Sequence, residues 1–206
     1  MKIDGGFAEV DAGLWLMGRS QPAAFFGSAV RRRRKGWCVR DRSRLDVVET
    51  SGAARCADAG RPFLTHIPCA APLFAVADKV LVAPASSRRA AHFVKVVPMS
   101  MRSALCVTEF GQEAWVVMAT ASRTTRIRLG DGETVSARPE SVVAWTGPRP
   151  TGFCPRLSLW DVLLPRGSRD LVFTFYGPGV VWIEGAAGPS AAGASVFDRR
   201  RRAYGV

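Results

Sequence analysis

Two histidines and five cysteines are the residues best suited to chemistry in this 206-residue chain. His66 and His92 lie far apart in the sequence, and neither belongs to a His-x-His pair of the kind that β-sandwich metal enzymes use. A site with three histidine nitrogens would need a second chain, so we expect no metal centre. The number of cysteines is odd and none has Cys-x-x-Cys spacing, which favours reduced, mostly buried thiols of a cytosolic protein. They are Cys38, Cys56, Cys69, Cys106 and Cys154.

Nucleophilic catalysis has little support in the sequence. No Gly-x-Ser-x-Gly elbow is present. Neither Cys106 nor Cys154 has a histidine beside it in the chain, although His66 or His92 would still be able to approach a cysteine in the fold. We therefore expect no nucleophile, and a packing role for Cys106.

Glycine pairs and carboxylate pairs also have plain interpretations. Neither Gly130-Asp131-Gly132 nor Gly177-Pro178-Gly179 is followed by the Lys-Ser or Lys-Thr of a phosphate loop, so both indicate tight turns. Glu109 and Glu113 flank one turn, and Asp131 and Glu133 flank another. Carboxylates at turns are expected to be solvated rather than paired across a glycosidase cleft.

The basic residues point to a different class of function. The net charge is +12, and nine of the positive charges lie in two short runs, so the rest of the chain carries only +3. Such runs are usually solvated loops or tails, but they also attract nucleic acid or an anionic surface. Arg126 and Arg128 alternate with Ile127 and Leu129, which predicts a second basic stripe on one face of a strand. The candidate anion contacts are Arg31, Arg32, Arg33, Arg34, Lys35, Arg126, Arg128, Arg199, Arg200, Arg201 and Arg202.

An internal repeat indicates the strands that would position these residues. Residues 105–117 and 171–183 share an apolar run, a Thr, an aromatic, a Gly, a short link and a second apolar run. The two copies lie 66 residues apart, counted from Gly111 to Gly177. We take them as copies of one β-hairpin, which predicts two similar halves that bury equivalent faces against each other.

Short strands separated by turns continue through the middle of the chain. The sequence predicts an all-β fold of two packed antiparallel sheets with internal pseudo-duplication, similar to a double-stranded β-helix. Residues 124–129 and 134–137 are expected to pair as a hairpin through the glycine-rich turn between them. We divide the chain into an irregular or partly β region 1–62, a β-sandwich core 63–184, and a flexible Gly/Ala- and Arg-rich tail 185–206.

The C-terminal part of the core resembles the AIM24 family, also called the mitochondrial-biogenesis or DUF124 group. The resemblance rests on residues 132–145 and on 171–184, where Tyr176-Gly177-Pro178-Gly179-Val180-Val181 is the most specific match. Weaker similarity reaches back to about residue 75. Gln112-Glu113 departs from the usual Gly-x-Gly, and the basic residues of 1–70 are unusual.

The resemblance implies a fold like that of the tryptophan RNA-binding attenuation protein and no enzymatic activity, cofactor or catalytic residue. We therefore expect a non-enzymatic binding or scaffold protein that forms homo-oligomers through sheet edges or through an exposed apolar face. A nucleic-acid-binding protein that uses the Arg runs, or an enzyme with an unrecognised site, stays an alternative. The composition favours the bacterial cytoplasm, whereas the resemblance implies a mitochondrion if the source is eukaryotic. The longest apolar runs are too short to span a bilayer.

Overall fold

The computed structural model has almost only β-strands, which confirms the all-β fold class. Within the described residues the helices are three-residue 3-10 turns, η1 (Ala77–Lys79), η2 (Ala85–Ser87) and η4 (Pro139–Ser141), and none is long and apolar enough to cross a membrane. The structure describes residues 2–4, 7–10, 15–19, 23–26, 30–33, 45–50, 54–94, 105–112, 114–153 and 172–185. Residues 154–171 and the tail 186–206 lie outside these residues.

One six-stranded arrangement is easiest to see in the middle of the chain, in what we call the second unit. Its first, sixth and third strands lie side by side, and so do its second, fifth and fourth strands. Every one of these pairs is antiparallel. The strands are β8 (Phe63–Cys69), β9 (Leu73–Val76), β10 (Val80–Pro84), β11 (Arg88–Val94), β12 (Leu105–Phe110) and β13 (Ala114–Thr120).

The third unit repeats this arrangement strand for strand. A 3-10 turn again precedes the third strand, η4 here and η1 in the second unit. The strands are β14 (Thr124–Leu129), β15 (Thr134–Ala137), β16 (Val142–Thr146), β17 (Thr151–Phe153), β18 (Val172–Tyr176) and β19 (Gly179–Glu184).

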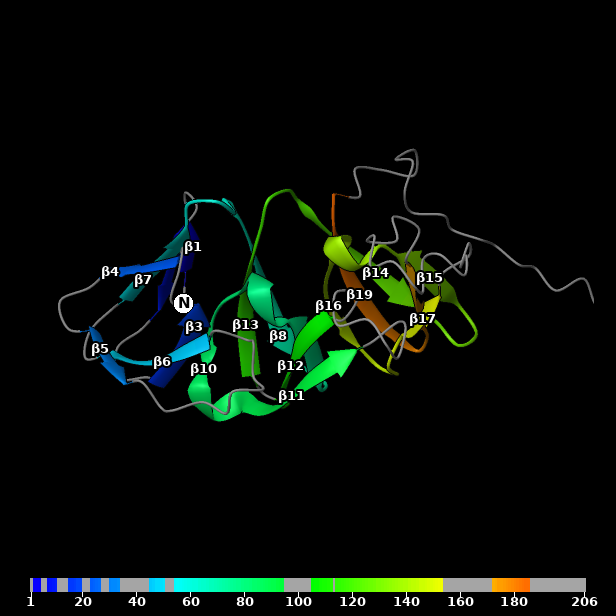
Figure 1. The fold of residues 1–206 in the computed structure, drawn as a ribbon, viewed down its shortest axis with the longest axis horizontal. Coiled ribbons are helices and arrows are strands. Elements are labelled where there is room, and N and C mark those ends of the chain that lie inside the picture. The colour runs from blue at the N-terminus through cyan, green and yellow to red at the C-terminus, as the bar shows by residue number, and fades with distance from the viewer. Residues whose placement is uncertain are drawn as a thin grey trace, which may run out of the picture.

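A first unit with the same order of pairing lies at the N-terminal end. An extra strand, β1 (Lys2–Asp4), pairs with its first strand. The expected two halves are therefore three units, which follow one another along the long axis of the molecule (Figure 1). The strands are β2 (Phe7–Val10), β3 (Trp15–Arg19), β4 (Ala23–Phe26), β5 (Val30–Arg33), β6 (Leu45–Thr50) and β7 (Ala54–Asp58).

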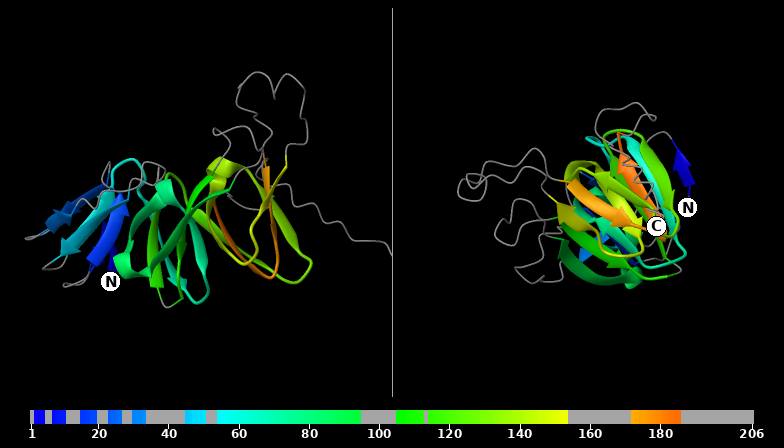
Figure 2. Two further views of the ribbon diagram at one scale, coloured as in Figure 1. Left: turned by 60° about the horizontal axis from the view of Figure 1, so that its bottom comes forward. Right: turned by 90° about the vertical axis from the view of Figure 1, so that its right-hand side faces the viewer.

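Neighbouring units share sheets, so the described strands form four sheets rather than the two expected. Sheet A is β1-β2-β7-β4 and sheet D is β15-β18-β17, one at each end of the row (Figures 1 and 2). Sheet B, β5-β6-β3-β10-β13-β8, joins half of the first unit to half of the second. Sheet C, β11-β12-β9-β16-β19-β14, joins the second unit to the third in the same way.

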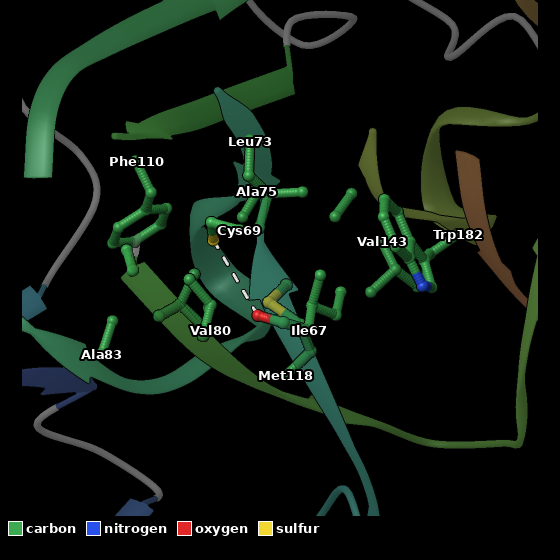
Figure 3. Close-up of a cluster of buried hydrophobic side chains, with 13 residues drawn as sticks. Ile67, Cys69, Leu73, Ala75, Val80, Ala83, Phe110, Met118, Val143 and Trp182 are labelled. Carbon is green, nitrogen blue, oxygen red and sulfur yellow. Dashed lines mark hydrogen bonds between the residues drawn. The ribbon is translucent and has the colours of Figure 1, made fainter. Parts of the chain in front are cut away.

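Among the described residues, three hydrophobic clusters fill the spaces between these sheets. Ala8 and Cys56 of sheet A pack with Leu81 and Val117 of sheet B. A second cluster lies between sheets B and C and contains Ile67, Leu73, Phe110, Met118 and Trp182 (Figure 3). The third cluster lies between sheets C and D and contains Val107, Trp145, Phe173 and Phe175. Burial of this apolar surface is the main force that holds the row together.

Position in the row explains the two kinds of strand pattern. Sheets B and C are covered on both faces, so β10 and β16 each begin with four consecutive buried residues, Val80–Ala83 and Val142–Trp145. Sheets A and D have one outer face, so β2 and β15 alternate between buried and less buried residues. The continuous apolar runs therefore mark interior sheets, and the alternating runs mark the ends.

Two pairings expected from the sequence are wrong. The segment 124–129 pairs with β19 and 134–137 pairs with β18, so these strands enter different sheets across the turn instead of forming a hairpin. The repeated segment is also a corner rather than a hairpin, because β12 pairs with β9 and β11 whereas β13 pairs with β8 and β10. The repeat itself is confirmed, because Gly111 and Gly177 both link the fifth strand of a unit to its sixth.

Candidate functional site

The joints between units are the most distinctive sites of the chain. At the first joint, β10 pairs antiparallel with β3, with Val82 opposite Gly18. At the second joint, β16 pairs antiparallel with β9, with Trp145 opposite Phe74. In both, the third strand of a unit adds to the second strand of the unit before it, so the same edge-to-edge contact is used twice.

A buried lysine bridges the second joint. Lys79 ends the η1 turn of the second unit, and only 6% of its side chain is exposed. Its Nζ lies 3.0 Å from a carboxylate oxygen of Glu184 on β19 and donates to the main-chain oxygen of Glu140 in η4. Loss of hydration lowers the pKa of Lys79, and the neighbouring Glu184 opposes that shift. The ammonium is thus held by two groups of the third unit.

A second ion pair continues this cluster toward the first unit. Arg61, in the link from β7 to β8, donates to the carboxylate of Asp78 at 2.9 Å and to the main-chain oxygen of the same residue. We call Arg61, Asp78, Lys79 and Glu184 the joint cluster. Each of its charges has a partner of opposite sign, so the arrangement favours cohesion between units over acid–base chemistry.

Lys79→Met is expected to lower the free energy of unfolding by about 3 kcal/mol, because it leaves the largely buried Glu184 carboxylate without its partner. The double variant Lys79→Met/Glu184→Leu is expected to recover most of that loss, because no unpaired charge stays behind. Urea denaturation followed by circular dichroism measures both variants. Arg61→Met is the matched control, with an expected loss below about 1 kcal/mol, because Asp78 is exposed to water. A double variant no better than Lys79→Met would contradict this view of the cluster.

The predicted basic residues are not brought together. Arg31, Arg32 and Arg33 lie on β5, at the edge of sheet B in the first unit. Arg126 and Arg128 lie on β14 in the third unit, far along the row (Figure 1). The other members of the two runs, namely Arg34, Lys35, Arg199, Arg200, Arg201 and Arg202, lie outside the described residues.

The short stripe on β14 has the geometry that alternation predicts. Arg126 and Arg128 are exposed, whereas Leu129 is buried and Ile127 is half-buried. The Arg126 guanidinium lies 5.8 Å from the centre of the Trp182 ring, which is itself buried. A guanidinium over an indole face gives a modest attraction that fixes this arginine on the sheet.

The histidines and cysteines do not assemble a reactive centre among the described residues. His66 is exposed on β8, and partial loss of hydration lowers its pKa. His92 lies on β11, in a different sheet. Within the described part of the chain no three His, Cys, Asp or Glu residues come close enough to hold a metal ion. Cys106 is half-buried on β12, while Cys38 and Cys154 lie outside the described residues.

Burial raises the pKa of Cys56 to about 12 and that of Cys69 to about 11. Both thiols pack in hydrophobic clusters, and Cys69 donates weakly to the Ile67 carbonyl oxygen, 3.8 Å away (Figure 3). Because the thiolate is the reacting form, iodoacetamide at pH 8 is expected to leave both unmodified in the folded protein and to label both in urea. Mass spectrometry of peptides measures this; fast labelling of either thiol without urea would show that its cluster opens.

The glycine pairs and the Asp131–Glu133 pair serve turns, as expected, but the expectation of a solvated turn position is wrong for Glu109. The Glu133 carboxylate accepts a hydrogen bond from the Gly130 main-chain nitrogen at 2.7 Å, and Gly132 has a φ of 76°. A Cβ placed on Gly177 would lie 1.9 Å from the Gly130 oxygen, so the corner after β18 passes directly against this turn. Glu109 is half-buried on β12, and Glu113 lies outside the described residues.

No member of the joint cluster is predicted as a site residue from the sequence. One signal was available: Asp78-Lys79-Val80-Leu81 and Glu140-Ser141-Val142-Val143 are similar, and they occupy the same place in the second and third units. The lysine at that place in the second unit donates to the main chain of the residues at that place in the third unit.

Comparisons with known proteins support the fold alone. No protein-family model matches the chain, and no curated protein matches it. The fold is similar to the crystal structure of protein SPYM3_0169 from Streptococcus pyogenes, with a TM-score of 0.62 and 13% sequence identity. The match covers 86% of each chain, so it spans most of the row of units.

Proposed function

We propose that this chain is a non-catalytic, AIM24-like β scaffold that associates with further copies of itself. The observation that carries the proposal is that the chain already joins units twice by adding one strand edge to another. The absence of a metal-binding group of residues among those described is compatible with a scaffold, and the joint cluster serves cohesion.

Size-exclusion chromatography with light scattering tests this proposal. The expected result is a particle heavier than one chain, whose mass rises with protein concentration or settles at a fixed multiple. A mass of one chain at every concentration would contradict it. The measurement is made on the full chain, including the tail 186–206.

A nucleic-acid-binding function is the second candidate, and the exposed Arg126 and Arg128 on β14 favour it. Its expected signature is binding to a fluorescent single-stranded RNA that weakens steeply with salt, because arginines that contact phosphates displace counterions. Arg126→Ser/Arg128→Ser is expected to weaken that binding at low salt. Unchanged binding in this variant, and in one that also lacks the basic runs, would exclude the arginines as the contact.

A further inference from the structure

We propose that copies of this chain join head to tail, with β4 of one copy pairing antiparallel along the open edge of β15 of the next. This inference rests on the proposed self-association and specifies its geometry. The partner is a second copy of the same chain, and the contact is the one that already joins the units within it.

The first step of the argument is the rule that the chain follows internally. Each joint pairs the third strand of a later unit with the second strand of the unit before it. The registers also agree within one residue. Thr146, the last residue of β16, lies opposite Leu73, the first of β9, whereas Pro84, the last of β10, lies opposite Leu16, the second of β3.

The second step is that each end of the row has an edge strand equivalent to one of the two strands of an internal joint. In the first unit, β4 is the third strand and has no earlier unit to join; it is the last strand of sheet A. In the third unit, β15 is the second strand and has no later unit; it is the last strand of sheet D. Among the described strands, β4 pairs only with β7 and β15 only with β18.

The main chain of β15 directs hydrogen-bonding groups to the side on which a further strand would be added. The Gly177 nitrogen donates to the Glu133 oxygen at 2.9 Å, which fixes the alternation of the ladder with β18. Residues of an antiparallel strand alternate between bonding the neighbour and pointing away from it. By that alternation Thr134 and Ser136 direct their main-chain N–H and C=O groups to the open side.

The sequence of β4 suits the other half of the joint. Its residues, Ala-Ala-Phe-Phe, are all apolar, as are the first four residues of β10 and of β16. The extra strand β1 lies at the opposite edge of sheet A, so none of the described strands covers the β4 edge. An apolar edge strand invites pairing with another chain unless a protein protects it. The internal rule then predicts Phe26 opposite Thr134 or Val135.

This contact uses a different surface on each copy, so the association is heterologous and produces a ring or an open row. Pairing of β15 with β15, or of β4 with β4, would give only a closed dimer. The two geometries are therefore distinguishable by how a variant blocked at one edge behaves.

Thr134→Pro removes the N–H that we place on the open side and is at the first residue of an edge strand, where proline is tolerated. Light scattering is expected to give a mass of one chain for this variant. Added in a minor amount to the wild type, it is expected to lower the mean mass by capping one end. Thr124→Pro is the matched control. It is also at the first residue of an edge strand, β14, which internal joints do not use, and it is expected to keep the wild-type mass.

If a proline variant fails to fold, photo-cross-linking tests the head-to-tail geometry instead. Arg138 is exposed and directly follows β15, so we replace it with benzoylphenylalanine and illuminate the full chain. The expected product links position 138 to the tryptic peptide 20–31 of another copy, which contains β4. Oligomers cross-linked elsewhere, or oligomers that survive in folded Thr134→Pro, would overturn the head-to-tail geometry and leave self-association standing. A wild type that stays a single chain would overturn both.

Discussion

Gly177→Ala is expected to lower the free energy of unfolding by about 4 kcal/mol or more, which is a large loss for the addition of one methyl group. The added Cβ would lie 1.9 Å from the Gly130 oxygen and 2.8 Å from the Gly130 carbonyl carbon. Both atoms belong to the backbone of the turn between β14 and β15, so no side chain is able to rotate out of the way. Relief requires the corner after β18 to move away from that turn.

Such a movement would disturb two sheets together. The corner carries the chain from β18 in sheet D to β19 in sheet C, and the Gly177 nitrogen bonds the Glu133 oxygen at the start of β15. The measurement is urea denaturation followed by circular dichroism. Gly130→Ala is the control, because its Cβ would meet nothing closer than 3.5 Å, and we expect a change within about 0.5 kcal/mol. Equal stability of the two variants would mean that the corner is loosely packed.

The same observation gives Gly177 a physical reason. A chain that leaves one sheet and enters the next within two residues must turn where another segment already lies, and a side chain has no room there. Gly179 is under the same constraint, because a Cβ on it would lie 2.4 Å from the Thr146 oxygen. The Gly-Pro-Gly segment that carries the family resemblance is therefore explained by packing at a corner, without a ligand.

Strand positions were predictable from the sequence, but strand partners were not. The ranges 124–129 and 134–137 agree with β14 and β15 at both ends, because turn residues bound each predicted strand. The turn between β14 and β15 suits a hairpin and a corner equally well. Which one forms depends on β19 and β18, whose residues pair with residues 36 to 60 positions earlier in the chain and cover the two strands separately.

The first unit was not predicted from the sequence, because its copy of the repeat lacks the aromatic residue and the glycine that the other two copies share. At the place of Phe110-Gly111 and Tyr176-Gly177 the chain has Thr50-Ser51. What the units share is the order of strand pairing, which tolerates many different apolar residues. The joint cluster was hidden for a similar reason, since Lys79 and Glu184 are brought together only by the docking of one unit on another. The face shared by Arg126 and Arg128, by contrast, followed from local alternation alone.

Trp145 offers the most direct measure of how firmly two units are joined. It lies on β16 of the third unit, directly opposite Phe74 on β9 of the second unit, and only 1% of its surface is exposed. The two rings stack, with centroids 5.5 Å apart and planes inclined by 19°. Phe175 of β18 packs on the indole ring at 5.4 Å and 60°. The Trp145 side chain therefore fills the core at the point where the edges of the two units meet.

Trp145→Ala is expected to lower the free energy of unfolding by about 4 kcal/mol, because it removes two ring contacts and leaves a large cavity in a core covered on both sides. Trp145→Phe is expected to cost only about 1–2 kcal/mol, since it keeps an aromatic ring against Phe74 and Phe175. The Trp145 indole nitrogen has no hydrogen-bond partner among the described residues, so replacing it with the smaller ring gives up no hydrogen bond to them. Urea denaturation followed by circular dichroism compares the variants with Tyr176→Phe, an exposed aromatic expected to change stability by less than about 0.5 kcal/mol. If Trp145→Ala were no more harmful than Trp145→Phe, the second joint would owe its stability to backbone pairing and the joint cluster rather than to this core.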